Sequence, residues 1–158
     1  MTRSEESDTL QTFATFRVAG DLLVPDDVTR ILRVPPTQAY SKGERYWGGP
    51  HSPALLGRTG IWYLSTDRLA ASRRLDDHIG LLIGLLTAQR GDSLPLIQLN
   101  QLLKRDALKA HVSCYWFGRA GAKKPAISPI VTKLFRLLPA DIETDFGTEE
   151  KSDGRRVA

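Results

Sequence analysis

Few residues of this chain belong to the types that most often perform chemistry, and the first pair to consider is Cys114 with His111. A thiolate beside an imidazole is a common nucleophile and base in enzymes. Both residues belong to an apolar segment, His111–Phe117, with the composition of a β-strand. Residues three apart on a strand point to opposite faces. We therefore predict that Cys114 is a packed, unreactive thiol, since no nearby residue in the sequence would lower its pKa.

Metal and cofactor chemistry has little support in the sequence. The three histidines, His51, His78 and His111, are dispersed and show none of the short spacings typical of zinc sites. The P-loop, the glycine motif of dinucleotide-binding folds and the Gly-x-Ser-x-Gly elbow of hydrolases are also missing. We predict no metal site, no cofactor and no catalytic residues. A small enzyme with an unrecognised site stays open as an alternative.

The carboxylates Asp26 and Asp27 could be interpreted as an acid/base pair. Neighbouring residues on a helix point in different directions, however, and no histidine is near them in sequence. Pro25 before them is tolerated in the first turn of a helix, where acidic side chains interact favourably with the helix dipole. We predict that the two carboxylates stabilise the start of a helix.

The segment Lys42–Thr59 is the strongest candidate for a binding surface. Tyr, Trp and Arg are enriched at protein interfaces. Here one residue of each type follows the next in sequence, directly before a Gly-Gly-Pro turn. The predicted contact residues are Lys42, Arg45, Tyr46, Trp47 and His51. The alternative is that Trp47 folds back over the edge of a sheet, which would make the segment a structural lid.

The elements that position these residues follow from hydrophobic periodicity. Ala14, Phe16 and Val18 alternate with Thr15 and Arg17, which predicts a strand with one buried face. A helix begins at Pro25 and must end before Pro35-Pro36, because a residue that precedes proline favours extended conformations. The chain then extends as a second strand over Thr37–Ser41.

The second half of the chain alternates helices with strands. Glu44–Thr59 is rich in glycine and proline and is predicted as one long loop. Gly80 and Gly84 interrupt the longest helix, so we expect a close packing contact there. The remaining predicted elements are a central strand over Gly60–Thr66, helices over Leu75–Leu86, Leu96–Leu103 and Ile130–Leu138, a strand over His111–Phe117, and a last strand over Ile142–Phe146 with one acidic face.

This order predicts an α+β sandwich of the ferredoxin-like, split β-α-β kind. Helices are expected on one face of a mainly antiparallel sheet, with an extra helix and strand at the C-terminal end. The single domain is predicted over residues 12–147. Residues 1–11 and 148–158 lack a hydrophobic pattern and are predicted to be flexible tails.

The residues Phe16–Glu44, FRVAGDLLVPDDVTRILRVPPTQAYSKGE, resemble the opening of a bacterial family known as domain of unknown function 4279. The sequences of its members tend to contain, in this order, a strand, a glycine, a Leu-x-Pro motif, a short helix, a Pro-Thr pair and a Lys-Gly pair. The later segments GIWYLS and HVSCYWF are similar too, so the resemblance spans about Thr12 to Gly147. Arg33-Val34 stands where a glycine is expected near the end of the first helix. The resemblance implies no established activity.

Composition places the chain among globular proteins, with 158 residues of which 41% are hydrophobic and 25% charged. No apolar run is long enough to span a bilayer, and the acidic, polar N-terminus does not resemble a signal peptide. One cysteine cannot form an internal disulfide and suits a reducing compartment. We therefore predict a cytoplasmic protein.

The net charge of +4 makes nucleic acid a partner to consider. The basic residues form no long tract, which favours ordinary solubility; they occur as the pairs Arg73-Arg74, Lys104-Arg105, Lys123-Lys124 and Arg155-Arg156. Aromatic side chains on an open sheet face could stack on RNA bases, with Trp62, Tyr115, Trp116 and Phe117 as candidates. We predict that these are mostly core residues.

The sequence therefore favours a non-catalytic, cytoplasmic protein-binding module, such as an immunity protein, an antitoxin-like protein or an assembly subunit. Its partner would be another protein. A nucleic-acid-binding domain with a basic surface is the second hypothesis, and a membrane partner is not expected.

Overall fold

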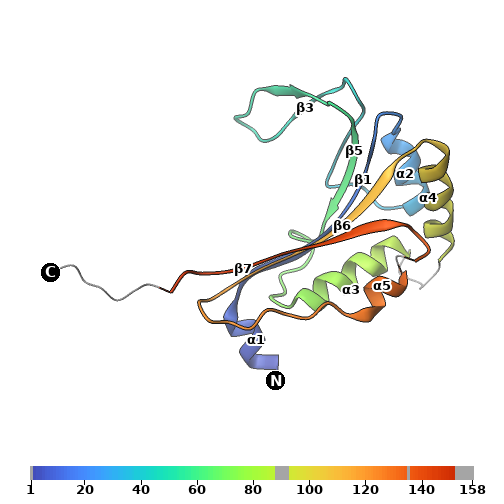
Figure 1. Cartoon of the computed structure of the whole chain (residues 1–158). Coiled ribbons are helices and arrows are strands. Elements are labelled where there is room, and N and C mark those ends of the chain that lie inside the picture. Colours follow the sequence, from blue (N-terminus) through green and yellow to red (C-terminus); the bar gives the residue numbers. More distant parts are fainter. Residues whose placement is uncertain (1, 88–92, 135, 152–158) are drawn as a thin grey trace.

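The structure, a computed structural model, describes residues 2–87, 93–134 and 136–151. A five-stranded sheet with the order β2-β5-β1-β6-β7 runs through the molecule (Figure 1). Its strands are β1 (Thr9–Gly20), β2 (Gln38–Tyr40), β5 (Gly60–Ser65), β6 (Lys109–Gly118) and β7 (Ala140–Thr148). Neighbouring strands are antiparallel except β6 and β7, which are parallel. The predicted mixed α+β architecture with a mainly antiparallel sheet is confirmed.

The central strand β1 carries the alternation seen in the sequence. Ala14, Phe16 and Val18 are 0% exposed, while Arg17 lies on the opposite face and is exposed. β5 pairs with one edge of β1 and β6 with the other, so these apolar side chains lie at the middle of the core. The hydrophobic effect therefore favours this register over a shift by one residue, which would expose them.

The helices that follow β1 cover one face of the sheet (Figure 1). α3 packs on β1 and β6, and α2 packs on β5 and on α4. These helices are α2 (Pro25–Leu32), α3 (Leu75–Leu86), α4 (Leu94–Arg105) and α5 (Pro129–Leu134). α5 is shorter than the predicted helix, and it leads into β7. None of the helices in the described ranges is long and apolar enough to cross a membrane.

The structure describes part of each end that the sequence predicts to be a flexible tail. Residues Thr2–Asp8 form a short helix, α1, and β1 begins directly after it. The Thr9 hydroxyl donates a hydrogen bond of 2.8 Å to the Glu5 carbonyl and accepts one of 2.9 Å from the Trp116 indole, which ties α1 to the sheet. At the other end, Thr148 closes β7, and residues 152–158 of the predicted tail lie outside the described residues.

The end of α2 has the backbone conformation that favours the missing glycine. Arg33 takes a left-handed conformation with φ of 55°, and its N–H donates to the Thr29 carbonyl at 2.7 Å. Glycine is the usual residue at such a helix end, because its lack of a Cβ removes the steric cost. The helix therefore ends in the common way with an uncommon residue, just before Pro35-Pro36.

The predicted close contact at Gly80 and Gly84 is wrong. Apart from the backbone of its own helix and its chain neighbours, a Cβ added at either position would meet no heavy atom of the described residues within 4 Å. Both glycines lie inside α3, where glycine is less favourable than alanine by about 1 kcal/mol because of its larger loss of backbone entropy.

Gly80→Ala and Gly84→Ala should therefore each stabilise the protein, by about 0.5 to 1 kcal/mol, in urea denaturation followed by circular dichroism. The matched control is Gly57→Ala, where a Cβ would lie 2.7 Å from the Ser41 carbonyl oxygen and 2.8 Å from the Tyr40 ring. This control should lose stability. A lower denaturation midpoint for the two helix variants would show that the glycines have a packing role after all.

Candidate functional site

The segment predicted as one long loop contains a β-hairpin instead. β3 (Arg45–Trp47) and β4 (Ala54–Leu56) form a separate two-stranded antiparallel sheet. This hairpin arm, which we define as Glu44–Gly57, projects from the main sheet on the side opposite the helices (Figure 1). Strands of three residues are too short to show a clear alternation, which is why the sequence pattern did not reveal them.

The base of the hairpin arm is held by backbone hydrogen bonds. The Gly43 N–H donates to the Gly57 carbonyl at 2.8 Å, and the Gly57 N–H donates to the Glu44 carbonyl at 2.9 Å. The Glu44 carboxylate also accepts a hydrogen bond of 2.7 Å from the Ser41 N–H. These contacts join the arm to the end of β2 and fix the direction in which it leaves the sheet.

Tyr46 anchors the arm on the sheet. Its ring stacks on Tyr40 of β2 with the centroids 4.0 Å apart and the planes 4° from parallel. Burial, followed by the hydrogen bond to Tyr46, raises the pKa of the Tyr40 hydroxyl. Isolated hairpins are at best marginally stable, so this stack is a main reason that the arm keeps its shape. Tyr46, a predicted contact residue, thus serves as an anchor.

Two other predicted contact residues project from the arm. In the hairpin, Arg45 lies opposite Leu56 and Trp47 lies opposite Ala54. These four side chains therefore lie on one face of the arm, and Tyr46 lies on the other. Trp47 is 62% exposed and Leu56 is 63% exposed. A structural lid requires a buried indole, and the exposed Trp47 does not fit that alternative.

Lys42 and His51 lie at opposite ends of the arm. The Lys42 ammonium contacts the Asp21 carboxylate at 3.0 Å, and this hydrogen bond lowers the pKa of Asp21. Lys42 therefore links the base of the arm to the turn after β1. His51 is exposed in the turn that joins β3 to β4, and it makes no hydrogen bond or ion pair with the described part of the chain.

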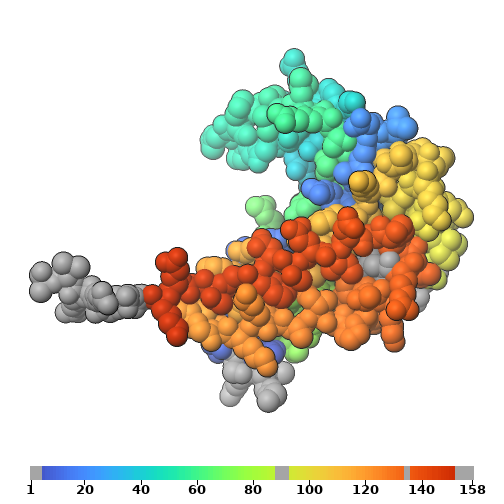
Figure 2. Space-filling model, viewed as in Figure 1, coloured from blue at the N-terminus to red at the C-terminus, as the bar shows by residue number. Residues whose placement is uncertain are grey.

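A cleft of about 780 Å³ separates the arm from the sheet. Figure 2 shows this hollow between the arm and the body of the protein. Trp47 and Gly48 form the wall on the arm. The opposite wall comes from the connection before β2, from β5 with the turn after it, and from α3; it contains Val34, Pro35, Pro36, Thr37, Gln38, Tyr63, Leu64, Ser65, Asp67, Arg68, Leu69 and Leu85.

Leu56 and Leu69 are exposed apolar residues that were not among the predicted contact residues; Leu69 is 56% exposed. The sequence did contain a signal for Leu56. Leu55 and Leu56 are adjacent in a glycine- and proline-rich segment that has no amphipathic pattern, so their burial is not expected. Leu69 had no comparable signal, because only the fold brings it to the cleft.

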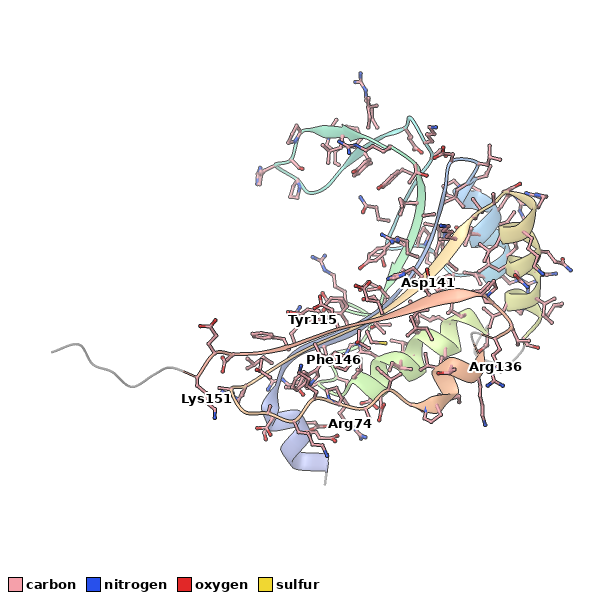
Figure 3. All side chains as sticks on the ribbon, viewed as in Figure 1. Arg74, Tyr115, Arg136, Asp141, Phe146 and Lys151 are labelled. Carbon is pink, nitrogen blue, oxygen red and sulfur yellow. The ribbon has the colours of Figure 1, made fainter. Side chains whose placement is uncertain are left out.

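The face of the sheet without helices is a second surface to consider. Tyr115 stacks on Phe13 there with centroids 4.7 Å apart, whereas Trp62 and Trp116 are buried in the core. The acidic side chains of β7, Asp141, Glu143 and Asp145, lie on the same face as Tyr115, and Figure 3 shows Tyr115 and Asp141 on this side and Phe146 on the other. Two of the four predicted stacking residues are therefore core residues.

The residues that first suggested chemistry do not form a site. Cys114 is buried on the helix side of the sheet, and burial raises the pKa of its thiol to about 11, so the predicted packed thiol is confirmed. His111 lies on the other face, where its Nε2 is 2.9 Å from a Glu143 carboxylate oxygen. The described residues contain no group of three side chains that could hold a metal ion.

Comparison with known proteins supports a single assignment. No curated protein and no solved structure matches the chain. The family described as Domain of unknown function (DUF4279) matches residues 10–148. This range runs from the second residue of β1 to the last residue of β7 and includes the hairpin arm. The chain therefore belongs to the DUF4279 family of proteins.

Proposed function

We propose that this protein is a non-catalytic cytoplasmic module that binds another protein through the hairpin arm and the cleft beside it, as an immunity protein, an antitoxin-like protein or an assembly subunit would. The observation that carries the proposal is the exposed Trp47 on an arm whose base is rigidly held. A large aromatic side chain on a pre-organised support is typical of the residues that dominate binding energy.

The charges around the cleft indicate the chemistry of the partner. Arg45, Arg58 and Arg68 are exposed, and none of them forms an ion pair within the described residues. Trp47 and Leu56 supply exposed apolar area on the arm beside Arg45, and Leu69 supplies it next to Arg68 at the cleft. The surface therefore suits a protein segment that presents an apolar anchor flanked by Asp or Glu.

Nucleic acid is a weaker candidate. The aromatic pair of Phe13 and Tyr115 could stack on bases, but Asp141, Glu143 and Asp145 lie along the same face and would repel phosphates. An electrophoretic shift that weakens steeply between low and high salt would favour this alternative over protein binding.

The strand order supports the finer fold assignment. β1 and β2 are joined through α2 but are separated in the sheet by β5, and β5 and β6 are joined through two helices but are separated by β1. Two such interleaved units correspond to the ferredoxin-like, split β-α-β plan. We infer this plan, extended by α5 and the parallel strand β7.

Trp47→Ala should abolish partner binding without loss of stability. The exposed indole has few contacts to lose. The free energy of unfolding, obtained from the denaturation midpoint, should therefore change by no more than about 0.5 kcal/mol. Arg45→Ala should weaken binding as well. The matched control is Ile130→Ala on α5, where the side chain is 55% exposed but lies away from the arm.

Partners would be captured from lysate with each variant and identified by mass spectrometry, and binding would be repeated with purified components. The prediction requires a protein that the parent and Ile130→Ala retain and that Trp47→Ala loses. Acrylamide quenching adds an internal check, because Trp62 and Trp116 are buried and the quenchable fluorescence should come from Trp47. A partner that Trp47→Ala still binds, or a collapse of its midpoint, would contradict the proposal.

A further inference from the structure

Two basic pairs that are far apart in the sequence meet at one cavity. Arg73-Arg74 precedes α3, and Lys123-Lys124 lies in the connection between β6 and α5. All four residues line a cavity of about 410 Å³ near α1, and Figure 3 labels Arg74 at this end of the molecule. The fold therefore brings these four basic residues, which are far apart in the sequence, to the wall of one cavity.

Arg74 is the residue that most needs a ligand. Its side-chain Nε is buried and has no hydrogen-bond partner among the residues that the structure describes. Its backbone is fixed, because its N–H donates to the Ser72 hydroxyl at 3.1 Å and its carbonyl accepts from the Asp77 N–H at 3.1 Å. A buried donor on a charged group is costly to leave unpaired, so an acceptor that enters the cavity would relieve this cost.

The carboxylates at the cavity do not neutralise these cations directly. Glu5, Asp8 and Asp76 also line it, but no ion pair joins them to the four basic residues in the part of the chain that the structure describes. The cationic groups therefore remain available, while the carboxylates limit how strongly the cavity attracts an anion.

We propose that this cavity binds a small phosphorylated molecule. Phosphate oxygens are the acceptors that arginine forks and lysine ammonium groups recognise best. The volume lies within the range of about 300 to 1,000 Å³ that small-molecule sites occupy. Trp116 and Pro125 add apolar walls, against which the unphosphorylated part of the molecule would pack. This site is separate from the hairpin arm and does not rest on the proposed protein binding.

Inorganic phosphate and adenosine monophosphate are suitable probes for calorimetric titration of the full chain at pH 7.5, with sodium chloride added to hold the ionic strength constant. Both probes should bind, and the monophosphate should bind more tightly because its ring adds contacts. Lys124→Ala and Arg73→Ala remove exposed side chains without affecting the fold, and each should weaken binding by about fivefold to tenfold.

Three further variants make the test specific. Lys104→Ala removes an exposed lysine of α4 outside the cavity and should leave the affinity unchanged. Trp47→Ala should also leave it unchanged, which separates this site from the hairpin arm. Glu5→Gln removes a carboxylate from the cavity wall and should strengthen binding, because it lessens the repulsion of the anion.

The proposal is overturned if phosphate has no more effect than chloride at equal ionic strength. It is also overturned if Lys104→Ala weakens binding as much as Lys124→Ala, since the attraction would then be a property of the whole basic surface. A single-stranded oligonucleotide that binds far more tightly than either probe, with a steep dependence on salt, would assign the cavity to nucleic acid instead.

Discussion

A Trp62→Ala variant should be less stable than the parent protein by about 3 to 5 kcal/mol, the usual cost of truncating a large buried aromatic side chain. Trp62 is 0% exposed and packs edge to face on Phe16, with ring centroids 6.3 Å apart. Domains of this size have a total stability of about 5 to 15 kcal/mol, so the loss could leave a large unfolded fraction at 25 °C.

The indole also makes a hydrogen bond that alanine cannot replace. Its Nε1 donates to the Thr29 hydroxyl at 3.0 Å, which connects β5 with α2. Trp62→Phe keeps much of the buried area but loses this bond, so it should cost less than alanine. Urea denaturation followed by circular dichroism would measure both variants.

Tyr63→Ala is the matched comparison, because Tyr63 is the next residue of β5 and lies on the face without helices. It should cost less than Trp62→Ala, since it is only half-buried. A Trp62→Ala variant that melts like the parent would show that Trp62 lies at the surface, and it would restore the hypothesis of a stacking platform for nucleic acid.

The second large loss of stability is expected when His78 is replaced. Its side chain is 1% exposed and lies at the start of α3. Its Nε2 lies 2.7 Å from the Ser72 carbonyl, and its Nδ1 lies 2.7 Å from the Thr66 hydroxyl. A carbonyl can only accept, so Nε2 carries a proton and donates to Ser72, and Nδ1 forms the second hydrogen bond with the Thr66 hydroxyl. The imidazole therefore connects α3 to Thr66, directly after β5, and to Ser72 in the connection that precedes the helix.

His78→Ala should destabilise the protein by about 2 to 4 kcal/mol, because it leaves a cavity and removes the donor from the Ser72 carbonyl. The Thr66 hydroxyl has an alternative acceptor, the Ala14 carbonyl at 3.2 Å, which limits the loss. Differential scanning calorimetry of the variant against the parent would measure the change.

Two substitutions at Thr66 separate hydrogen bonding from packing. Thr66→Ser keeps the hydroxyl and should have a small effect. Thr66→Val has a similar shape but cannot accept from the Ala14 N–H, which is 3.0 Å away and buried, so it should cost about 1 to 3 kcal/mol. Equal stability of Ser and Val variants would show that the buried hydrogen bonds have no net effect.

Elements with long, regular periodicity were predictable from the sequence. α3 begins and ends at the predicted residues, because five apolar side chains recur at helical spacing from Leu75 to Leu86, with Asp76-Asp77 in the first turn. The buried face of β1 was predictable for the same reason, since the alternation of Ala14, Phe16 and Val18 reports burial directly.

Predictions from local sequence patterns were wrong where contacts between separate elements determine the structure. The spacing of Gly80 and Gly84 suggested a close helix contact, yet a Cβ at either position would have no neighbour within 4 Å from another element of the described chain. The hairpin arm was predicted as a loop because each strand has only three residues. Its shape depends on the stack between Tyr40 and Tyr46, which are separated in sequence and in contact only in the fold.

The sequence by itself determined the buried alternation of β1, the apolar stripe of α3 and the interface-like composition of the segment that became the hairpin arm. Only the tertiary structure decided which of those residues anchor the arm and which project from it. It also joined Arg73-Arg74 to Lys123-Lys124 at one cavity, although the same pairs are scattered along the chain. The physical reason is that periodicity reports whether a side chain is buried, whereas the neighbours of a side chain depend on how distant strands pair.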